Sequence, residues 1–144
     1  RAACRHPDLL ADGVAGDPFA LAPAELLARA WAVVEPAYLA RLAKLTEDFG
    51  VAASRQQGTA DLSDAARAAV AARVGKLLVD ADQVQPGTID PATGEIRAQD
   101  LADPRVDDKL DDLAELVLKT GGEVVVVPSD KMPTKTGLAA IFRY

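Results

Sequence analysis

Residues 106–127 read VDDKLDDLAELVLKTGGEVVVV, a segment in which a helical pattern gives way directly to a strand pattern. Its apolar side chains recur at the spacing of one helix face, namely Val106, Leu110, Leu113 and Val117. The glycine pair 121–122 predicts the end of this helix. The unbroken valine run 124–127 lacks the alternation of a half-exposed strand, so it predicts a central strand buried on both faces.

Two further helices are expected before this segment. Apolar residues at helical spacing predict a helix that begins at Pro23. Pro36 should break or kink it, because proline lacks the backbone donor and clashes one turn back. A second helix is expected from about 37 to 48, with Gly50 as its stop. We expect Trp31, the single tryptophan, to pack in the core.

The middle of the chain predicts short elements around turn residues. Residues 50–61 allow a short strand and a loop at Gly58, and a helix capped by Ser63 or Asp64 should run to about residue 73. Gly75 is expected to end that helix and to precede a strand at 76–79. The turn sequence 90–94, DPATG, predicts a small hairpin between residues 88–89 and 95–96.

The elements near the end complete an α/β pattern. Asp103-Pro104 predicts a helix start, with the acid as cap and proline in the first turn. A polar loop at 128–137 should lead into a last strand at 138–142. The order of helices and strands predicts a mixed sheet sandwiched by helices.

Length and composition indicate one domain. We interpret residues 1–22 as an irregular lead-in and 23–144 as a single α/β domain, the C-terminal part of a longer protein because the chain begins with Arg1. No apolar run approaches the roughly 18 residues of a membrane span, so no membrane partner is expected. Cys4 is the single cysteine, which excludes an internal disulfide and fits a cytoplasmic location.

Negative charge is concentrated in residues 80–112. This segment holds ten acidic and three basic residues, within a chain of net charge −6. Such a surface disfavours phosphate backbones, which need clustered lysine and arginine. It is suited to a basic protein surface, or it is an acidic solvated face with no partner.

Residue types that carry chemistry are sparse. His6 is the single histidine, and Asp80-Ala81-Asp82 at a strand end has no nucleophile or phosphate loop beside it. One alternative is a metal-assisted enzyme that uses these two acids or the cluster of Asp107, Asp108, Asp111 and Asp112. We instead expect no enzymatic activity, no cofactor and no metal, with the cluster as a candidate partner-binding surface.

The loop 129–137 is the second candidate partner-binding segment. It carries Lys131, Met132 and Lys135 between two strands, and loops on rigid scaffolds often bind partners. A protein contact and an RNA contact both remain open for these side chains.

A family resemblance rests on three segments of the second half. Residues 106–128, the pair Met132-Pro133 and residues 137–144 resemble the C-terminal domain of bacterial proteins related to archaeal and eukaryotic peptide-chain release factors and to Pelota. Some members of that family are described as host-attachment-type proteins. Residues 73–80 and 87–90 are similar to the strand and hairpin of the same domain. The resemblance covers roughly residues 55–144.

The resemblance implies the fold of the kink-turn-binding ribosomal proteins and a role in translation termination, rescue or hibernation. In archaeal and eukaryotic relatives this domain docks a translational GTPase, so the implied partners are the ribosome, a translational GTPase, or both. Gly121-Gly122 is followed by Glu123 at a helix end, so no peptide-releasing Gly-Gly-Gln motif is carried over. The acidic balance departs from a kink-turn binder and favours protein over RNA. A strand expected before the first helix is missing, and the unpaired sheet position could support self-association.

Overall fold

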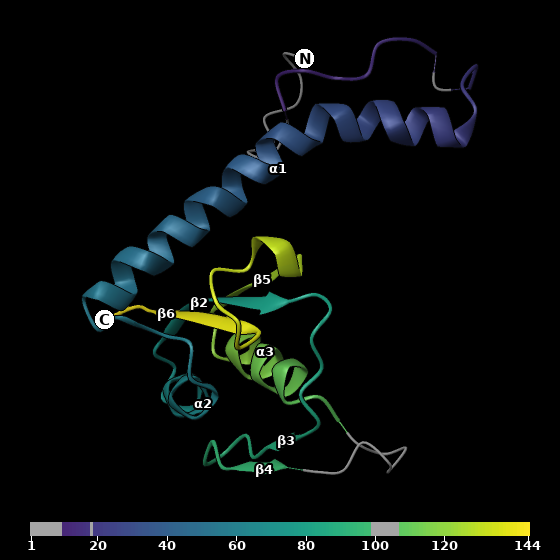
Figure 1. Cartoon of the computed structure of the whole chain (residues 1–144). Helices are drawn as coiled ribbons and strands as arrows, with labels where there is room; N and C mark the ends of the chain where they lie inside the picture. Colours follow the sequence, from purple (N-terminus) through teal and green to yellow (C-terminus); the bar gives the residue numbers. More distant parts are fainter. Residues whose placement is uncertain (1–9, 18, 99–106) are drawn as a thin grey trace. The chain divides into compact units, whose positions relative to one another are not determined.

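The computed structural model describes residues 10–17, 19–98 and 107–144 (Figure 1). The chain forms two compact units, Arg1–Ala43 and Lys44–Tyr144. The second unit contains the β-sheet and the candidate site. His6, Asp103, Pro104 and Val106 lie outside the described residues. The helix that the sequence predicted from Asp103 begins later, at Lys109, with Asp108 as its cap. No helix among the described residues is long and apolar enough to cross a bilayer.

Helix α1 (Pro23–Ser54) begins at the predicted proline but does not stop where the sequence suggested. It continues through Pro36 and Gly50, so the predicted second helix 37–48 is part of one continuous helix. Its alanine, leucine and charged residues are strong helix formers and outweigh the single missing hydrogen bond at the proline. Buried Leu45 and Phe49 anchor the turns around Gly50.

The first unit keeps much of its apolar surface exposed. Leu27, Trp31 and Val34 recur along one stripe of α1 and are exposed by 71%, 48% and 42%. The Trp31 ring lies 5.8 Å from the Tyr38 ring, measured between centroids. The expectation that Trp31 packs in the core is therefore wrong, because its side chain lies against Tyr38 and stays about half exposed.

One four-stranded mixed sheet organises the second unit. Its strands are β1 (Gly58–Thr59), β2 (Val74–Asp80), β5 (Glu123–Val127) and β6 (Leu138–Phe142), in the order β1-β6-β2-β5. β2 pairs with β5 in parallel, and β6 pairs antiparallel with both β1 and β2. The valine run is thus a strand, but it lies at an edge and not in the centre. The central positions belong to β2 and β6.

The core fills the space between the sheet and helices α2 (Leu62–Val70) and α3 (Lys109–Lys119), which lie on the same side of it (Figure 1). α2 contributes four alanines that let its backbone approach closely: Ala65, Ala66, Ala68 and Ala69. On the opposite face of the sheet, Leu78 and Ala139 are also fully buried. The end of α1 supplies buried Phe49 and Ala52, which lie outside the α2–α3 cluster.

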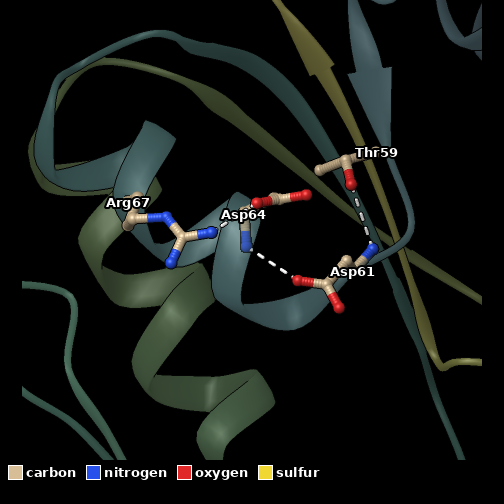
Figure 2. A network of polar contacts seen from close by, with 4 residues as sticks. All are labelled: Thr59, Asp61, Asp64 and Arg67. Carbon is tan, nitrogen blue, oxygen red and sulfur yellow. Dashed lines mark hydrogen bonds and ion pairs between the residues drawn. The ribbon is translucent and has the colours of Figure 1, made fainter.

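Helix α2 starts earlier and ends earlier than predicted. Asp61, rather than Ser63 or Asp64, is its cap, and the Asp61 carboxylate accepts from the Asp64 backbone N–H at 2.9 Å (Figure 2). The helix ends at Val70, and Gly75 lies within β2. Asp61 is the cap because its carboxylate can turn back and accept a backbone hydrogen bond from the first helical turn.

The predicted hairpin is confirmed as β3 (Gly87–Ile89) and β4 (Ile96–Ala98). Asp90 forms its turn by accepting from the backbone N–H groups of Ala92 and Thr93 at 2.8 and 3.0 Å. These two hydrogen bonds hold the pKa of the Asp90 carboxyl below its ordinary value.

Candidate protein-docking surface

Parallel pairing of β2 and β5 brings their carboxyl ends to one edge of the sheet, where Asp80 is in register with Val127. The loop after β2 and the loop after β5 therefore start next to each other. The start of α3 joins them, because Pro86 forms an isolated bridge with Asp108. We call the three segments 80–86, 107–112 and 128–137 together the carboxyl-edge surface.

Asp80 fixes the first contact within this surface. Its side chain is 6% exposed and accepts hydrogen bonds from the Ser129 hydroxyl at 2.5 Å and from the Asp82 backbone N–H at 2.9 Å. The Ser129 hydroxyl, and next the Asp82 N–H, lower the pKa of the Asp80 carboxyl. Asp80 therefore acts as a charged anchor for the turn η1 (Ser129–Lys131).

Two glutamines tie the loop after β2 to the loop after β5. The Gln83 amide donates to the Lys135 carbonyl at 3.3 Å, and the Gln85 amide donates to the Thr136 carbonyl at 2.7 Å. Gly137, at φ +77°, leaves the space that the Gln83 side chain occupies. The loop that carries Lys131, Met132 and Lys135 is thus held from beneath by the segment 80–86.

The loop after β2 is also fastened to the start of α3. Asp108 is the cap of α3, and its carboxylate accepts from the backbone N–H groups of Leu110 and Gln85 at 3.0 and 2.9 Å. The Asp112 carboxylate accepts from the Ile89 N–H at 2.7 Å and so attaches the hairpin. Of the four acids singled out in the sequence, Asp108 and Asp112 therefore have contacts inside the fold.

The remaining candidates lie on the outside of the carboxyl-edge surface. Exposed positions are Asp107, Asp111, Lys131 and Lys135, and Met132 is half-buried. The Lys131 ammonium lies 3.1 Å from the Asp130 carboxylate. Val84, which the sequence analysis did not single out, is 64% exposed in the same surface. An isolated valine among polar loop residues was the signal that could have identified it.

The charge of the carboxyl-edge surface is negative. It holds seven acidic and three basic residues, so its two exposed lysines sit among carboxylates. Among the described residues, no group of three or more histidine, cysteine or acidic side chains is arranged to hold a metal ion. The arrangement is suited to binding a partner through mixed polar, charged and apolar contacts.

A separate groove of about 560 Å³ lies beside β1, within the second unit. Its lining includes Thr59, Asp64, Arg67, Arg73 and Phe142. The Arg67 and Asp64 side chains pair at 2.5 Å (Figure 2), and the Arg73 guanidinium lies 5.3 Å from the centre of the Phe142 ring. Its charged side chains are thus engaged with one another or with the ring.

Comparison with solved structures identifies the fold. The C-terminal domain of a peptide chain release factor from Methanosarcina mazei aligns with a TM-score of 0.64 at 21% identity, over 84% of this chain and 93% of that domain. Dom34 from S. cerevisiae, a translation termination-like factor that interacts with Hbs1, aligns with a TM-score of 0.50 at 14% identity. That match covers 89% of this chain and 31% of Dom34. At these identities the likeness concerns the fold.

Comparison of the sequence with protein families gives a direct assignment. Residues 1–73 match bacterial archaeo-eukaryotic release factor family 3, a segment that takes in α1, β1 and α2. No curated protein matches the chain. The resemblance inferred from residues 55–144 and the family match over the first half of the chain thus indicate related release-factor proteins. The chain belongs to bacterial archaeo-eukaryotic release factor family 3, and its fold is that of a release-factor C-terminal domain.

Proposed function

We propose that this chain is a non-catalytic docking domain of a ribosome-associated, release-factor-like protein, and that it binds its partner through the carboxyl-edge surface. The observation that carries the proposal is the set of hydrogen bonds that Gln85 makes. Its side chain reaches the Thr136 carbonyl, and its backbone N–H reaches the Asp108 carboxylate. One residue thereby fixes two recognition segments relative to each other before any partner arrives, which lowers the entropy lost on binding.

The chemistry of the surface favours a protein partner. Val84 offers an exposed apolar side chain, Met132 a half-buried adaptable one, and Lys131 and Lys135 offer charges at the rim. An RNA backbone would meet more carboxylates than ammonium groups here, so its approach would be repelled at low salt. Direct RNA binding by the 129–137 loop is accordingly the weaker alternative.

A binding role also accounts for the acidic residues better than catalysis does. Asp80, Asp108 and Asp112 all accept backbone or hydroxyl hydrogen bonds that hold the loops together. A general base or metal ligand would need a carboxylate directed at a substrate position. We therefore assign these three acids to positioning, and Asp107, Asp111, Lys131, Met132 and Lys135 to partner contact.

Membership of a release-factor family points to translation as the process and to the cytoplasm as the compartment. Dom34 interacts with Hbs1, and this gives a precedent for a protein partner on a chain of similar fold. For this chain we propose the ribosome, a translational GTPase, or both as the partner.

Sedimentation with bacterial ribosomes tests the proposal. The full chain is centrifuged through a sucrose gradient with ribosomes, with and without a translational GTPase. We expect it to migrate with the ribosomes, more strongly with the GTPase. Changing Val84→Asp, or Lys131→Glu together with Lys135→Glu, should weaken binding by about tenfold or more.

Charge reversal elsewhere provides the matched control. Arg97→Glu together with Lys119→Glu changes the same charge at exposed side chains outside the carboxyl-edge surface and should leave migration unchanged. An equal loss of ribosome binding in both double variants would mean that the effect comes from the net charge of the chain and not from contacts of the carboxyl-edge surface. A wild-type chain that stays at the top of every gradient contradicts the proposal. Binding that disappears steeply with salt would indicate RNA contact instead.

A further inference from the structure

In the part of the chain that the structure describes, strand β5 has no neighbour on one of its two edges. It stands at the end of the order β1-β6-β2-β5 and pairs only with β2 among the described strands. Four of its five residues are valines, and Pro128 follows directly. Natural edge strands are usually protected by lysines, bulges or a covering segment, since a bare apolar edge invites another strand.

The backbone groups on that edge can be assigned from the hydrogen bonds on the inner side. The Val127 carbonyl accepts from the Ala81 N–H, which follows β2, so Val127 directs its backbone groups toward β2. Backbone direction alternates along a strand, so Val125 also faces β2, whereas Val124 and Val126 face outward. No hydrogen bond from another described segment reaches the outward groups of these two residues.

We propose that this edge pairs antiparallel with the β5 edge of a second copy of the chain. The two copies are related by a two-fold axis that lies midway between their Val125 residues. The two outward residues are separated by one position, so this axis places Val124 of each copy opposite Val126 of the other. Each of these residues has one N–H and one C=O, and the register satisfies all of them in hydrogen-bonded pairs. The edge is thus complementary to itself.

Side chains on the α3 side of the edge support the same register. Val126 is 60% exposed, and Leu118 on α3 is 58% exposed. Leu118 and Asp112, the residue that holds the hairpin, lie on different flanks of α3, so Leu118 points away from the hairpin. Two-fold pairing brings Val126 against Val124 of the second copy, with Leu118 beside them, and removes this apolar strip from water.

Charge also fits a second copy. The register places Glu123 opposite Val127 of the other copy, so no like charges face each other across the new strand pair. The net charge of −6 per chain opposes association as a whole. That repulsion is screened by salt, so dimerisation should strengthen as ionic strength rises.

Pairing should stop at a dimer. It consumes the β5 edge of both copies, and the other edge of the sheet, β1, has only two residues. A five-residue edge and two apolar side chains make an interface smaller than the roughly 1,600 Å² of a standard complex, so we expect weak, concentration-dependent association. This inference does not depend on the carboxyl-edge surface or its partner.

Cysteine cross-linking tests the register. In the full chain with Cys4→Ser, the variant Val125→Cys places two thiols across the two-fold axis, in a non-hydrogen-bonded pair with Cα atoms about 4.5 Å apart. That separation allows a disulfide. We expect a covalent dimer under mild oxidation on a non-reducing gel. Val84→Cys is the control: it is more exposed than half-buried Val125, so random collision would cross-link it faster.

Sedimentation equilibrium over a range of concentrations tests the association itself. We expect the wild-type chain to dimerise and Val126→Lys to raise the dissociation constant by about tenfold or more, because a charge at the edge blocks pairing. Val51→Lys, at an exposed valine off the edge and outside the carboxyl-edge surface, should leave this dissociation constant unchanged. A wild-type chain that remains monomeric up to about 1 mM overturns the inference, a concentration at which binding of only ~4 kcal/mol would be visible. Cross-linking of Val84→Cys but not of Val125→Cys overturns it too, and this result stands even if Val126→Lys fails to fold.

Discussion

The ends of the three helices offer a test in which two neighbouring residues should respond in opposite directions. At the end of each helix, the backbone N–H of the second residue after the C-terminal cap donates to the carbonyl of the residue five positions earlier. In α2 the Arg73 N–H donates to the Ala68 carbonyl at 2.8 Å. This motif requires a left-handed residue, and in α2 that residue is Ala72, at φ 54°. Its neighbour Ala71 has an ordinary φ of −78°.

The expected free energies follow from these angles. Ala72→Gly relieves roughly 1–2 kcal/mol of strain. Two contributions oppose this gain. Glycine makes the unfolded chain more flexible, which lowers the stability by roughly 0.4–1 kcal/mol, and loss of the half-buried Ala72 methyl lowers it by about 0.4 kcal/mol. The net result is a stabilisation of about 0.5 kcal/mol, or a rise in Tm of about 2–4 °C. Ala71→Gly relieves nothing and should destabilise by about 0.5–1 kcal/mol.

Urea unfolding at 25 °C, followed by circular dichroism, measures both variants against the wild-type chain. Equal m-values are required for the comparison, since a changed slope means a changed unfolded state. The reciprocal change is Gly121→Ala in α3, where φ is 77° and the nearest atom to an added Cβ is 3.8 Å away. It meets no steric clash and should cost about 1 kcal/mol from conformation alone. Similar losses for Ala71→Gly and Ala72→Gly would refute the reasoning.

Three further predictions concern the carboxyl-edge surface. Because the Ser129 hydroxyl lowers the pKa of Asp80, the stability that Asp80 adds should be fully present above pH 3.8 and fade as the pH falls through its folded pKa; the stabilities of wild type and Asp80→Asn, measured by urea titration, should therefore differ at pH 7, and the difference should shrink as the pH is lowered below 3.8. Gln85→Ala should lose about 1 kcal/mol and speed amide exchange across the loop after β5, and unchanged exchange there would remove its bridging role. Asp112→Ala should lose about 1.5–3 kcal/mol in thermal unfolding, whereas exposed Asp111→Ala should stay within about 0.5 kcal/mol, and equal effects would contradict the assigned contacts.

The features that were predicted correctly are those that residues close together in the sequence specify. The Asp90 turn, the glycine stop after α3 and the last strand are each specified by residues within a few positions, and all three were predicted. The position of β5 was predicted wrongly because a valine run reports strand propensity but not which strands pair with it. Likewise, no local signal at Pro36 reveals that the surrounding helix formers carry α1 through it.

The candidate site was predicted only in pieces. The acidic cluster and the 129–137 loop were identified separately, since each has a recognisable composition. Their juxtaposition depends on Gln83 and Gln85, whose side-chain partners lie 52 and 51 positions away along the chain. Glutamine in a loop carries no pattern of its own. Parallel pairing of β2 with β5 had to be known before these contacts could be expected.

The place of β6 in the sheet also has a consequence for biosynthesis. Residues 138–142 emerge after every other strand has been made, yet they lie between β1 and β2 and pair with both. A nascent chain that has reached residue 137 therefore exposes facing edges of β1 and β2 with nothing between them. Closure waits for the last five residues of the sheet, and such non-local pairing is slow. A chain interrupted before Leu138 should be a substrate for chaperones or proteases rather than a shortened working domain.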